Sequence, residues 1–372
     1  MNDSSLSRNK FMLKGSLSHL GYDWWWHSFT AINKTNNKQK AFYIEFFIIN
    51  PKESPDEIQY GQLNQKPSYT MINVGCWGDK PLQLHNFYKI NDTVINQEKL
   101  EIEVKNNFLS ETETFGEVKV SDAKAHPEYM SDNGHIKWNL KINKIIPFNV
   151  GYGASKPFRK LNAFEMFWHA EGMKTKYSGT IELNGEEYIV KPETSFGYAD
   201  KNWGKDFTSP WIWISSCNLV SRISGNKLEN SAFNIGGGKP KFMNIPLDKK
   251  LLVYIYYQGK KYNYNFALFW KYISTQFTCT ETDKEIIWTI KTRNYKSKAI
   301  ITCRCNKDEM LLINYESPDG KKRHNRLWNG GNGHGRIKLY KKHVLVYELI
   351  DDIDFYNAGC EYGVYPEKDS LY

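Results

Sequence analysis

The sequence lacks any apolar run long enough to form a membrane-spanning helix. Such a span needs roughly 18 residues without charge, whereas the apolar stretch from Phe42 to Ile49 has only the length of a strand and contains Glu45. The first residues, Met1 to Lys10, are polar and do not resemble a signal peptide. We therefore expect a protein that is not secreted by a recognisable signal and does not span a membrane.

Paired cysteines are lacking as well. Six cysteines are scattered along the chain without a CxxC motif, at Cys76, Cys217, Cys279, Cys303, Cys305 and Cys360. Cys303 and Cys305 fall on the same face of one expected strand, where the geometry for a mutual disulfide is poor. This cysteine usage predicts free thiols in a reducing, cytoplasmic compartment.

Motifs for metals and nucleotides are missing. The histidines are isolated, without the HxH or HExxH spacing of zinc sites. The glycine run 236–238 lacks the spacing of a phosphate-binding loop, and the glycine-rich stretch 330–335 has no βαβ pattern around it. We expect neither a metal nor a nucleotide cofactor.

Positive charge is modest overall but partly local. The formal net charge is +9 for 372 residues, and no acidic residue occurs between Gly320 and Val344. This basic stretch, Lys321 to Lys342, is typical of a solvated loop and strand face. It would equally suit peripheral contact with an anionic membrane, near which a lipid-soluble substrate would collect. No zinc-finger, helix-turn-helix or RNA-recognition motif supports nucleic-acid binding.

The periodicity of the sequence is that of strands. Short segments rich in Val, Ile, Thr and aromatic residues recur along the chain, and turn signals such as Asn184-Gly185 separate them. Only Leu161 to Met173 could form a short helix, and its alternating apolar residues fit a strand equally well. The pattern predicts an all-β protein built from two antiparallel barrels or sandwiches.

The length of 372 residues exceeds that of one ordinary domain. The stretch from Pro147 to Pro157 contains glycine and proline and is the expected connection between two halves. We predict an N-terminal β-domain over residues 1–155 and a C-terminal β-domain over residues 156–372.

The segment with the most chemical information is Phe196-Gly197-Tyr198-Ala199-Asp200-Lys201-Asn202-Trp203-Gly204. It places Asp200 among aromatic residues, just ahead of a strand in which Trp211 and Trp213 point to one face. Trp24 and Trp26 alternate in the same way near the N-terminus. Asp and Asn beside Gly are also typical of a hairpin turn, and tryptophans are typical of a core. The pattern alone leaves both interpretations open.

The order Gly-Tyr-Ala-Asp-Lys-Asn-Trp-Gly, followed by a Trp-x-Trp strand, resembles the signature of the tocopherol cyclase family. It is also similar to a segment of the carotenoid 1,2-hydratases and their lipocalin-like relatives. Residues 21–29 resemble the aromatic first strand of the family, and residues 358–363 resemble its closing, Glu-containing strand. The resemblance implies two lipocalin-like β-domains with a pocket at or near their junction.

The residues suggest a chemistry for such a pocket. A carboxylic acid enclosed by aromatic walls has a raised pKa, because burial disfavours its ionised form, and it can donate a proton near neutral pH. Protonation of a trisubstituted alkene gives a tertiary carbocation, which aromatic faces stabilise by roughly 0.5–2 kcal/mol each. A phenol oxygen then closes a ring, or water adds to give an alcohol. Neither route needs a metal or a redox cofactor.

The resemblance implies that Asp200 is this acid in a tocopherol cyclase-like enzyme that acts without a cofactor on a prenylated or other apolar small molecule. Hydration or isomerisation is the nearest related reaction, although Ala199 and Lys201 stand where the hydratases have histidines. The residues predicted to bind the substrate are Tyr198, Asn202, Trp203, Trp211, Trp213, Trp24 and Trp26.

Two alternatives remain open. The same scaffold could hold an apolar ligand without changing it. A carbohydrate-active β-protein would need two carboxylates that face each other across a sugar. Other carboxylates that deserve comparison are Asp23, Glu45, Glu165, Glu171 and Glu361, but no spacing in the sequence pairs any two of the acids.

Overall fold

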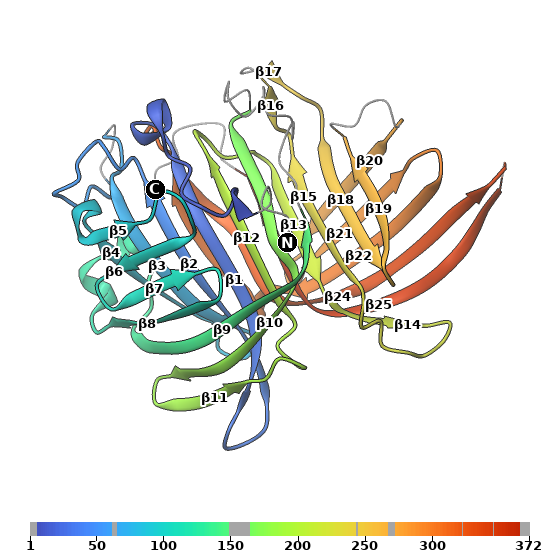
Figure 1. The fold of residues 1–372 in the computed structure, drawn as a ribbon, viewed down its shortest axis with the longest axis horizontal. Helices are drawn as coiled ribbons and strands as arrows, with labels where there is room; N and C mark the ends of the chain where they lie inside the picture. Colours follow the sequence, from blue (N-terminus) through green and yellow to red (C-terminus); the bar gives the residue numbers. More distant parts are fainter. Residues whose placement is uncertain are drawn as a thin grey trace.

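The computed structural model describes residues 6–61, 65–148, 164–242, 245–266, 272–321, 323–344 and 346–364. They form two large antiparallel sheets, which Figure 1 shows side by side, and one small two-stranded sheet. The first large sheet closes into a barrel, and the second curls into a half-barrel. The prediction of an all-β fold with two β-barrel or sandwich units is confirmed.

The first sheet contains twelve strands. Their bounds are β1 (Tyr22–Asn33), β2 (Gln39–Ile49), β3 (Tyr69–Trp77), β4 (Leu82–Tyr88), β5 (Thr93–Ile95), β6 (Glu101–Val104), β7 (Asn107–Ser110), β8 (Glu113–Val120), β9 (Gly134–Phe148), β10 (Met166–Leu183), β11 (Glu186–Val190) and β12 (Gly197–Gly204). The order is β4-β3-β2-β1-β11-β10-β9-β8-β7-β6-β5, and β12 pairs with both β1 and β10. Contacts between β4 and β8 bring the two sides of the barrel together.

The second sheet follows the order β19-β18-β15-β13-β25-β24-β22-β21-β20, with β14 on β25 and β23 on β24. Its strands are β13 (Trp211–Ser216), β14 (Asn218–Ser221), β15 (Ala232–Gly238), β18 (Lys250–Tyr257), β19 (Lys260–Asn265), β20 (Ser274–Glu281), β21 (Glu285–Arg293), β22 (Ser297–Asn306), β23 (Leu311–Glu316), β24 (Arg323–His343) and β25 (Val346–Gly363). The small sheet pairs β16 (Lys241–Phe242) with β17 (Ile245–Pro246). Short 3-10 helices occur at Gly15–Ser18, Ile90–Asp92, Ala123–Ala125, Pro127–Tyr129 and Lys307–Glu309.

Burial along the strands shows which faces are covered. β9 alternates between buried and more exposed residues, as expected where one face of a strand meets solvent. In β3 and β12 every residue is buried. These strands need two covered faces, and they have them because one face lines the barrel while the other packs against the second sheet. The larger core cluster accordingly joins residues of both sheets, such as Trp25 and Leu252.

Sheet membership changes between β12 and β13, after Gly204. The predicted connection, Pro147 to Pro157, lies outside the described residues from position 149 onward. β10 to β12 follow it in sequence and yet pair within the first sheet. The domain division at residue 155 therefore stays a prediction, whereas the hydrogen-bonded sheets divide about fifty residues later. The described end of the predicted helix-or-strand stretch, from Met166, belongs to strand β10.

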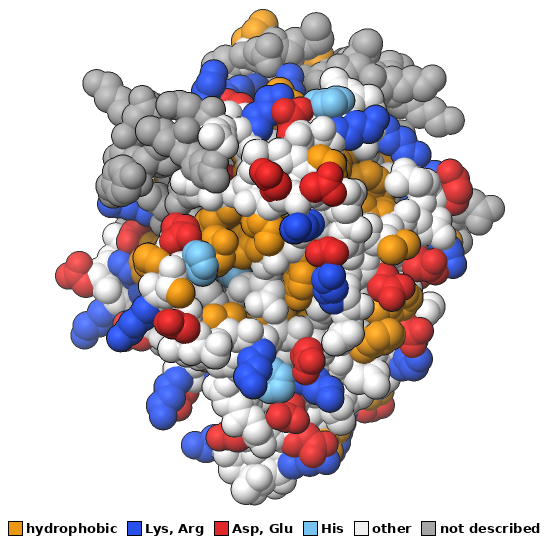
Figure 2. All heavy atoms as spheres, turned by 90° about the vertical axis from the view of Figure 1, so that its left-hand side faces the viewer, with side chains coloured by type: hydrophobic (Ala, Val, Ile, Leu, Met, Phe, Trp, Pro, Cys, Tyr) orange, Lys and Arg blue, Asp and Glu red, His pale blue; other side chains and the backbone are white. Residues whose placement is uncertain are grey.

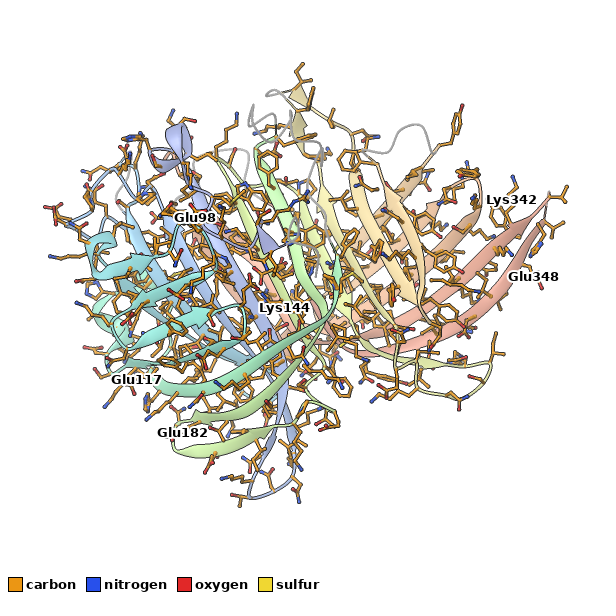
Figure 3. All side chains as sticks on the ribbon, viewed as in Figure 1. Glu98, Glu117, Lys144, Glu182, Lys342 and Glu348 are labelled. Atoms are coloured by element: carbon orange, nitrogen blue, oxygen red, sulfur yellow. The ribbon has the colours of Figure 1, made fainter. Side chains whose placement is uncertain are left out.

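The basic stretch lies mainly on β24, and its partner strand β25 carries acids. Arg336 forms a bidentate ion pair with Asp352, and Lys341 lies opposite Glu348 in the strand register. Figure 3 shows Lys342 and Glu348 near the far end of this hairpin. On the barrel face in Figure 2, side chains of both signs are interspersed. Part of the positive charge of Lys321 to Lys342 is therefore neutralised within the sheet. Contact of this stretch with a membrane stays a prediction.

The cysteines and the absence of long apolar segments are the subject of two expectations from the sequence. All six cysteines are free thiols, as their spacing predicted. Among the described residues, no helix has both the length and the apolar character needed to cross a membrane.

Candidate active site

A small cavity lies between the two sheets. Its walls come from β1 and β12 of the first sheet and from β13, β23 and β25 of the second, and they are Trp24, Trp26, Asp200, Asn202, Trp211, Trp213, Tyr315 and Glu361. Most of the residues that the sequence predicted for the site therefore meet here, although they come from distant parts of the chain. The cavity has a volume of about 10 Å³, which is room for about one water molecule.

Strand pairing explains how the first sheet contributes its half of the cavity. β12 pairs antiparallel with β1, so that Asp200 lies opposite Trp26 and Asn202 lies opposite Trp24. Because side chains alternate along a strand, these four residues point to the same side of the sheet. Tyr198 is on that side too, two residues before Asp200, and contacts its carboxyl group. The two-residue spacing in the sequence thus places these side chains on one face of the sheet.

Asp200 is buried, and its two oxygens have different surroundings. Its side chain is held through Oδ2, to which Nε1 of Trp168 donates at 2.7 Å and the hydroxyl of Tyr198 donates at 2.8 Å. Oδ1 has no hydrogen-bond partner among the described residues. Asp200 lines the cavity, and Oδ1 is the oxygen whose hydrogen-bonding capacity is not used by the described residues.

Burial raises the pKa of Asp200 to about 7. The hydrogen bonds from Trp168 and Tyr198 favour the ionised form and lower the pKa in part, while the negative charge of Glu361 raises it. A carboxyl group with this pKa is protonated in a large fraction of molecules at neutral pH. Asp200 can therefore act as a proton donor in a place that water hardly reaches.

A second carboxylic acid lines the same cavity. Glu361 lies opposite Trp213 in the pairing of β25 with β13. Nε1 of Trp211 donates to its Oε2 at 2.7 Å, and Nδ2 of Asn329 donates to its Oε1 at 2.6 Å. Burial raises the pKa of Glu361 to about 7, and these two hydrogen bonds lower it only in part. Two acids with raised pKa values therefore line one cavity. When one of them ionises, its negative charge disfavours ionisation of the other, so that one group can stay protonated while its neighbour is ionised.

Aromatic rings from both sheets pack around these acids. The rings of Trp24 and Tyr315 stack across the junction of the sheets with their centres 5.2 Å apart. The ring of Trp168, which donates to the Asp200 carboxyl group, approaches Gly236 of the second sheet so closely that a Cβ atom there would lie 2.6 Å from it. A larger residue at Gly236 would therefore displace the indole that holds the candidate acid.

The opposite face of β12 points into the barrel and carries a buried ion pair. The ammonium group of Lys201 contacts the Asp23 carboxylate, both side chains are fully buried, and the ammonium nitrogen lies 3.6 Å from the ring centre of Trp25. Trp203 shares this face and stacks on Phe167 at 5.5 Å. The structure does not place Trp203 with the cavity residues, because the alternation of β12 turns it to the other side.

Comparison with known proteins gives the chain its family. A family model described as tocopherol cyclase-like matches residues 57–364. The chain belongs to this family. The matched region includes both Asp200 and Glu361, and membership supports an enzymatic activity of the cyclase type. No curated protein matches the sequence.

Solved structures resemble this tocopherol cyclase-like chain over nearly its whole length. Kievitone hydratase from Nectria haematococca is 13% identical, with a TM-score of 0.50 over 97% of this chain and 92% of the hydratase. A protein assigned as AttH from Nitrosomonas europaea is 12% identical, with a TM-score of 0.47 over 90% and 92%. CghA with Sch210972 is 8% identical, with a TM-score of 0.46 over 93% and 89%. At these identities the likeness concerns the fold alone.

Sequence reasoning does not assign three residues that the site contains. Glu361 is one of several unassigned acids in the sequence, although its resemblance to the closing strand of the tocopherol cyclase family is a usable signal. Trp168 lies in a stretch whose helix-or-strand character is ambiguous. Tyr315 has no recognisable motif around it. The second sheet brings Tyr315 and Glu361 to the cavity through pairings that no local pattern encodes.

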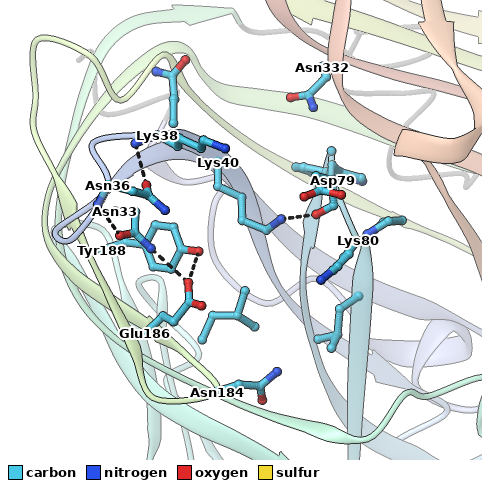
Figure 4. Close-up of a pocket in the computed structure, with 16 residues that line it drawn as sticks. Asn33, Asn36, Lys38, Lys40, Asp79, Lys80, Asn184, Glu186, Tyr188 and Asn332 are labelled. Carbon is cyan, nitrogen blue, oxygen red and sulfur yellow. Dashed lines mark hydrogen bonds between the residues drawn. The ribbon is translucent and has the colours of Figure 1, made fainter.

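A larger cavity of about 520 Å³ lies at the turns of the first sheet, as Figure 4 shows. Glu186 there accepts hydrogen bonds from Asn33 and Tyr188, and Lys40 donates to the backbone oxygen of Asp79. None of the predicted site residues lines this polar cavity. Within the described part of the chain, no group of three or more His, Cys, Asp or Glu side chains is arranged to hold a metal ion. The junction of the sheets is the candidate site despite its small volume, because two carboxylic acids with raised pKa values line one cavity there together with the predicted tryptophans.

Proposed function

We propose that this member of the tocopherol cyclase-like family is a cofactor-independent acid catalyst that closes a ring in a prenylated or other apolar small molecule. The observation that carries the proposal is Asp200, a buried acid with a pKa of about 7 that lines an aromatic cavity and whose Oδ1 is unbonded among the described residues. Family membership supports the reaction type. The wall residues of the cavity supply the surroundings that a carbocation needs.

The reaction begins with neutral Asp200. Its proton passes to one carbon of a trisubstituted double bond, whose π electrons form the new C–H bond, and the other carbon becomes a tertiary cation. A phenol oxygen of the same molecule attacks that carbon, and the phenol proton passes to the Glu361 carboxylate. The substrate is isomerised, and one proton has moved from Asp200 to Glu361. Proton exchange between the two acids or with solvent restores the starting state after product release.

The tryptophans of the cavity stabilise the cation without reacting with it. Trp24, Trp26, Trp211 and Trp213 line the space on both sheets. An aromatic face offers negative potential without a nucleophilic lone pair and contributes roughly 0.5–2 kcal/mol to a nearby cation.

Substrate binding in this proposal requires the two aromatic walls to separate, because a volume of about 10 Å³ does not admit a prenylated ring. We expect association to be slower than the roughly 10⁵–10⁷ M⁻¹s⁻¹ of binding without rearrangement. Stopped-flow tryptophan fluorescence should show an observed rate that levels off as ligand concentration rises, because opening becomes limiting. A rate that increases linearly to the solubility limit of the ligand would contradict this expectation.

The paired acids predict a bell-shaped dependence of kcat/KM on pH with its maximum near neutral pH. Both pKa values are about 7. As the pH falls, both groups become protonated and no base remains; as it rises, both ionise and no acid remains. In Glu361→Gln the acidic limb should disappear. The alkaline limb should move to lower pH, because the charge that raises the pKa of Asp200 is gone. An unchanged profile in this variant would exclude Glu361 as the partner acid.

Hydration of a double bond is the second candidate, and the size of the cavity favours it. Room for about one water molecule beside Asp200 would let water attack the cation in place of a phenol oxygen. Mass spectrometry of products separates the two reactions, because cyclisation conserves the mass of the substrate and hydration adds one water. The departures at Ala199 and Lys201 concern residues on the barrel-facing side of β12, away from this cavity.

A further inference from the structure

A chain of hydrogen bonds runs behind the aromatic wall of the cavity. The hydroxyl of Tyr315 donates to Oε1 of Glu45 at 2.9 Å, and Nδ2 of Asn73 donates to Oε2 of Glu45 at 2.9 Å. The hydroxyl of Tyr43 donates to Oδ1 of Asn73, also at 2.9 Å. Glu45 is 0% exposed. Of these four residues only Tyr315 lines the cavity, so this hydrogen-bond chain reaches a bound molecule through Tyr315.

The hydrogen-bond capacity of each group restricts how this chain responds to a proton. Ionised Glu45 accepts both bonds as described. Neutral Glu45 carries a proton that needs an acceptor, because an unpaired buried donor is costly. The amide nitrogen of Asn73 cannot accept a proton, whereas the hydroxyl oxygen of Tyr315 can. The proton of the Tyr315 hydroxyl is then released from Glu45 and can be donated into the cavity.

We propose that Glu45 and Tyr315 form a proton-controlled hydrogen-bond switch at the candidate active site. With Glu45 neutral, Tyr315 donates a hydrogen bond to an oxygen atom of the bound molecule, such as a phenol, ether or carbonyl oxygen. With Glu45 ionised, the hydroxyl turns back to the carboxylate and the bound oxygen loses its donor. Glu45 is thus a positioning residue. The class of ligand in this inference rests on the proposed function, whereas the switch rests on the hydrogen bonds of Glu45 and Tyr315 alone.

The groups around Glu45 favour its neutral form at neutral pH. Burial raises its pKa to about 8, the hydrogen bonds from Asn73 and Tyr315 lower it in part, and the charges of Glu361 and Asp200 raise it. The phenol of Tyr43, on the same strand, has its own pKa raised well above the usual value by burial and is neutral here. The donating state therefore prevails below about pH 8 and is lost as the pH rises above that value.

Ligand binding gives the first test. The probe is a hydroquinone dimethyl ether with a saturated alkyl chain, which accepts hydrogen bonds but can neither ionise nor react. In the unmodified protein we expect its affinity to fall about three- to tenfold as Glu45 ionises, the worth of one neutral hydrogen bond. In Glu45→Gln this fall should be absent, because the amide nitrogen donates to Tyr315 and the amide oxygen accepts from Asn73 at every pH. Tyr315→Phe should bind weakly at every pH.

Tyr43→Phe is the matched control, because it also removes a tyrosine hydroxyl group, but from the far end of the hydrogen-bond chain. It should keep the fall in affinity above about pH 8. In the alternative arrangement, the Asn73 amide is reversed and its oxygen accepts the proton of neutral Glu45. Tyr43→Phe would then change the pH at which Glu45 ionises, and ligand affinity of the unmodified protein would not depend on Glu45. Equal affinity of the unmodified protein on both sides of pH 8 overturns the switch.

Infrared spectroscopy tests the switch without any ligand. The difference spectrum between about pH 6 and about pH 10 should show loss of a neutral carboxylic acid band together with a change in a tyrosine C–O band. Asp200 and Glu361 also ionise in this range, so the signal of the switch is what remains when the spectrum of Glu45→Gln is subtracted from that of the unmodified protein. This remainder should contain one carboxylic acid band and one tyrosine band, and the tyrosine band should be absent when Tyr315→Phe takes the place of the unmodified protein. A Glu45 carboxyl band without a coupled tyrosine band overturns the proposal. Failure of the probe to bind, with both infrared bands present, would count against the proposed function and leave the switch standing.

Discussion

Replacement of Asp200 by Asn should lower kcat by about 10²- to 10⁴-fold, the usual contribution of a positioned general acid. The amide has nearly the shape of the neutral carboxyl group and still accepts the hydrogen bonds that Trp168 and Tyr198 donate. It cannot transfer a proton to carbon. Ligand affinity and thermal stability should change little, because a neutral group already occupies this buried place in a large fraction of molecules near pH 7.

The matched control for this substitution is Asp206→Asn. Asp206 lies just after β12, outside the cavity, and contacts Lys241 at 3.4 Å. It should retain full turnover. A protein that only binds its ligand would show no turnover in either variant, and the two variants could differ only in affinity. Full turnover by the Asp200→Asn variant, in a folded preparation, would contradict acid catalysis by this residue.

Separation of the buried pair Lys201–Asp23 should give the largest loss of stability. Lys201→Met leaves the Asp23 carboxylate without its cation in the barrel interior, where both side chains are fully buried. Removing one partner of a buried pair costs about 3–5 kcal/mol in free energy of unfolding. Burial already raises the pKa of Asp23 and lowers that of Lys201, so each ion depends on the other. Denaturant unfolding monitored by tryptophan fluorescence measures the change.

Two further variants make this prediction specific. The double variant Asp23→Leu with Lys201→Met should recover most of the lost stability, because it removes both charges and leaves apolar side chains. Lys99→Met breaks an ion pair with Glu101 that is largely exposed to solvent, so it should cost at most about 1 kcal/mol. Similar losses in Lys99→Met and Lys201→Met would show that burial is not what makes the pair important.

The sequence predicted the part of the site that depends on alternation within single strands. The two-residue spacing of Tyr198, Asp200 and Asn202 places all three on one face of β12, and the tryptophans of β13 follow the same rule. Alternation also explains why Lys201 does not meet Asp200. The same rule applied to Trp203 turns it away from the cavity, because it lies three positions after Asp200 and an odd offset places two residues on opposite faces of a strand.

The parts that could not be predicted depend on contacts between sheets. Glu361 and Tyr315 reach the cavity only because β25 pairs with β13 and β23 pairs with β24. Register between strands that are distant in sequence is set by the packing of the whole core, which no single segment encodes. The same limitation applies to β10: its pairing with β12 places it in the first sheet, although the predicted connection precedes it.

Deuterium incorporation tests the central claim most directly. The protein and its Asp200→Asn variant would be incubated in heavy water with prenylated hydroquinones and linear isoprenoids, and the products followed by mass spectrometry. Proton-initiated cyclisation predicts an isomeric product with one deuterium fixed at carbon, and no such product from the variant. A cyclised product without deuterium at carbon, or one labelled equally by both proteins, would contradict protonation of the double bond by Asp200.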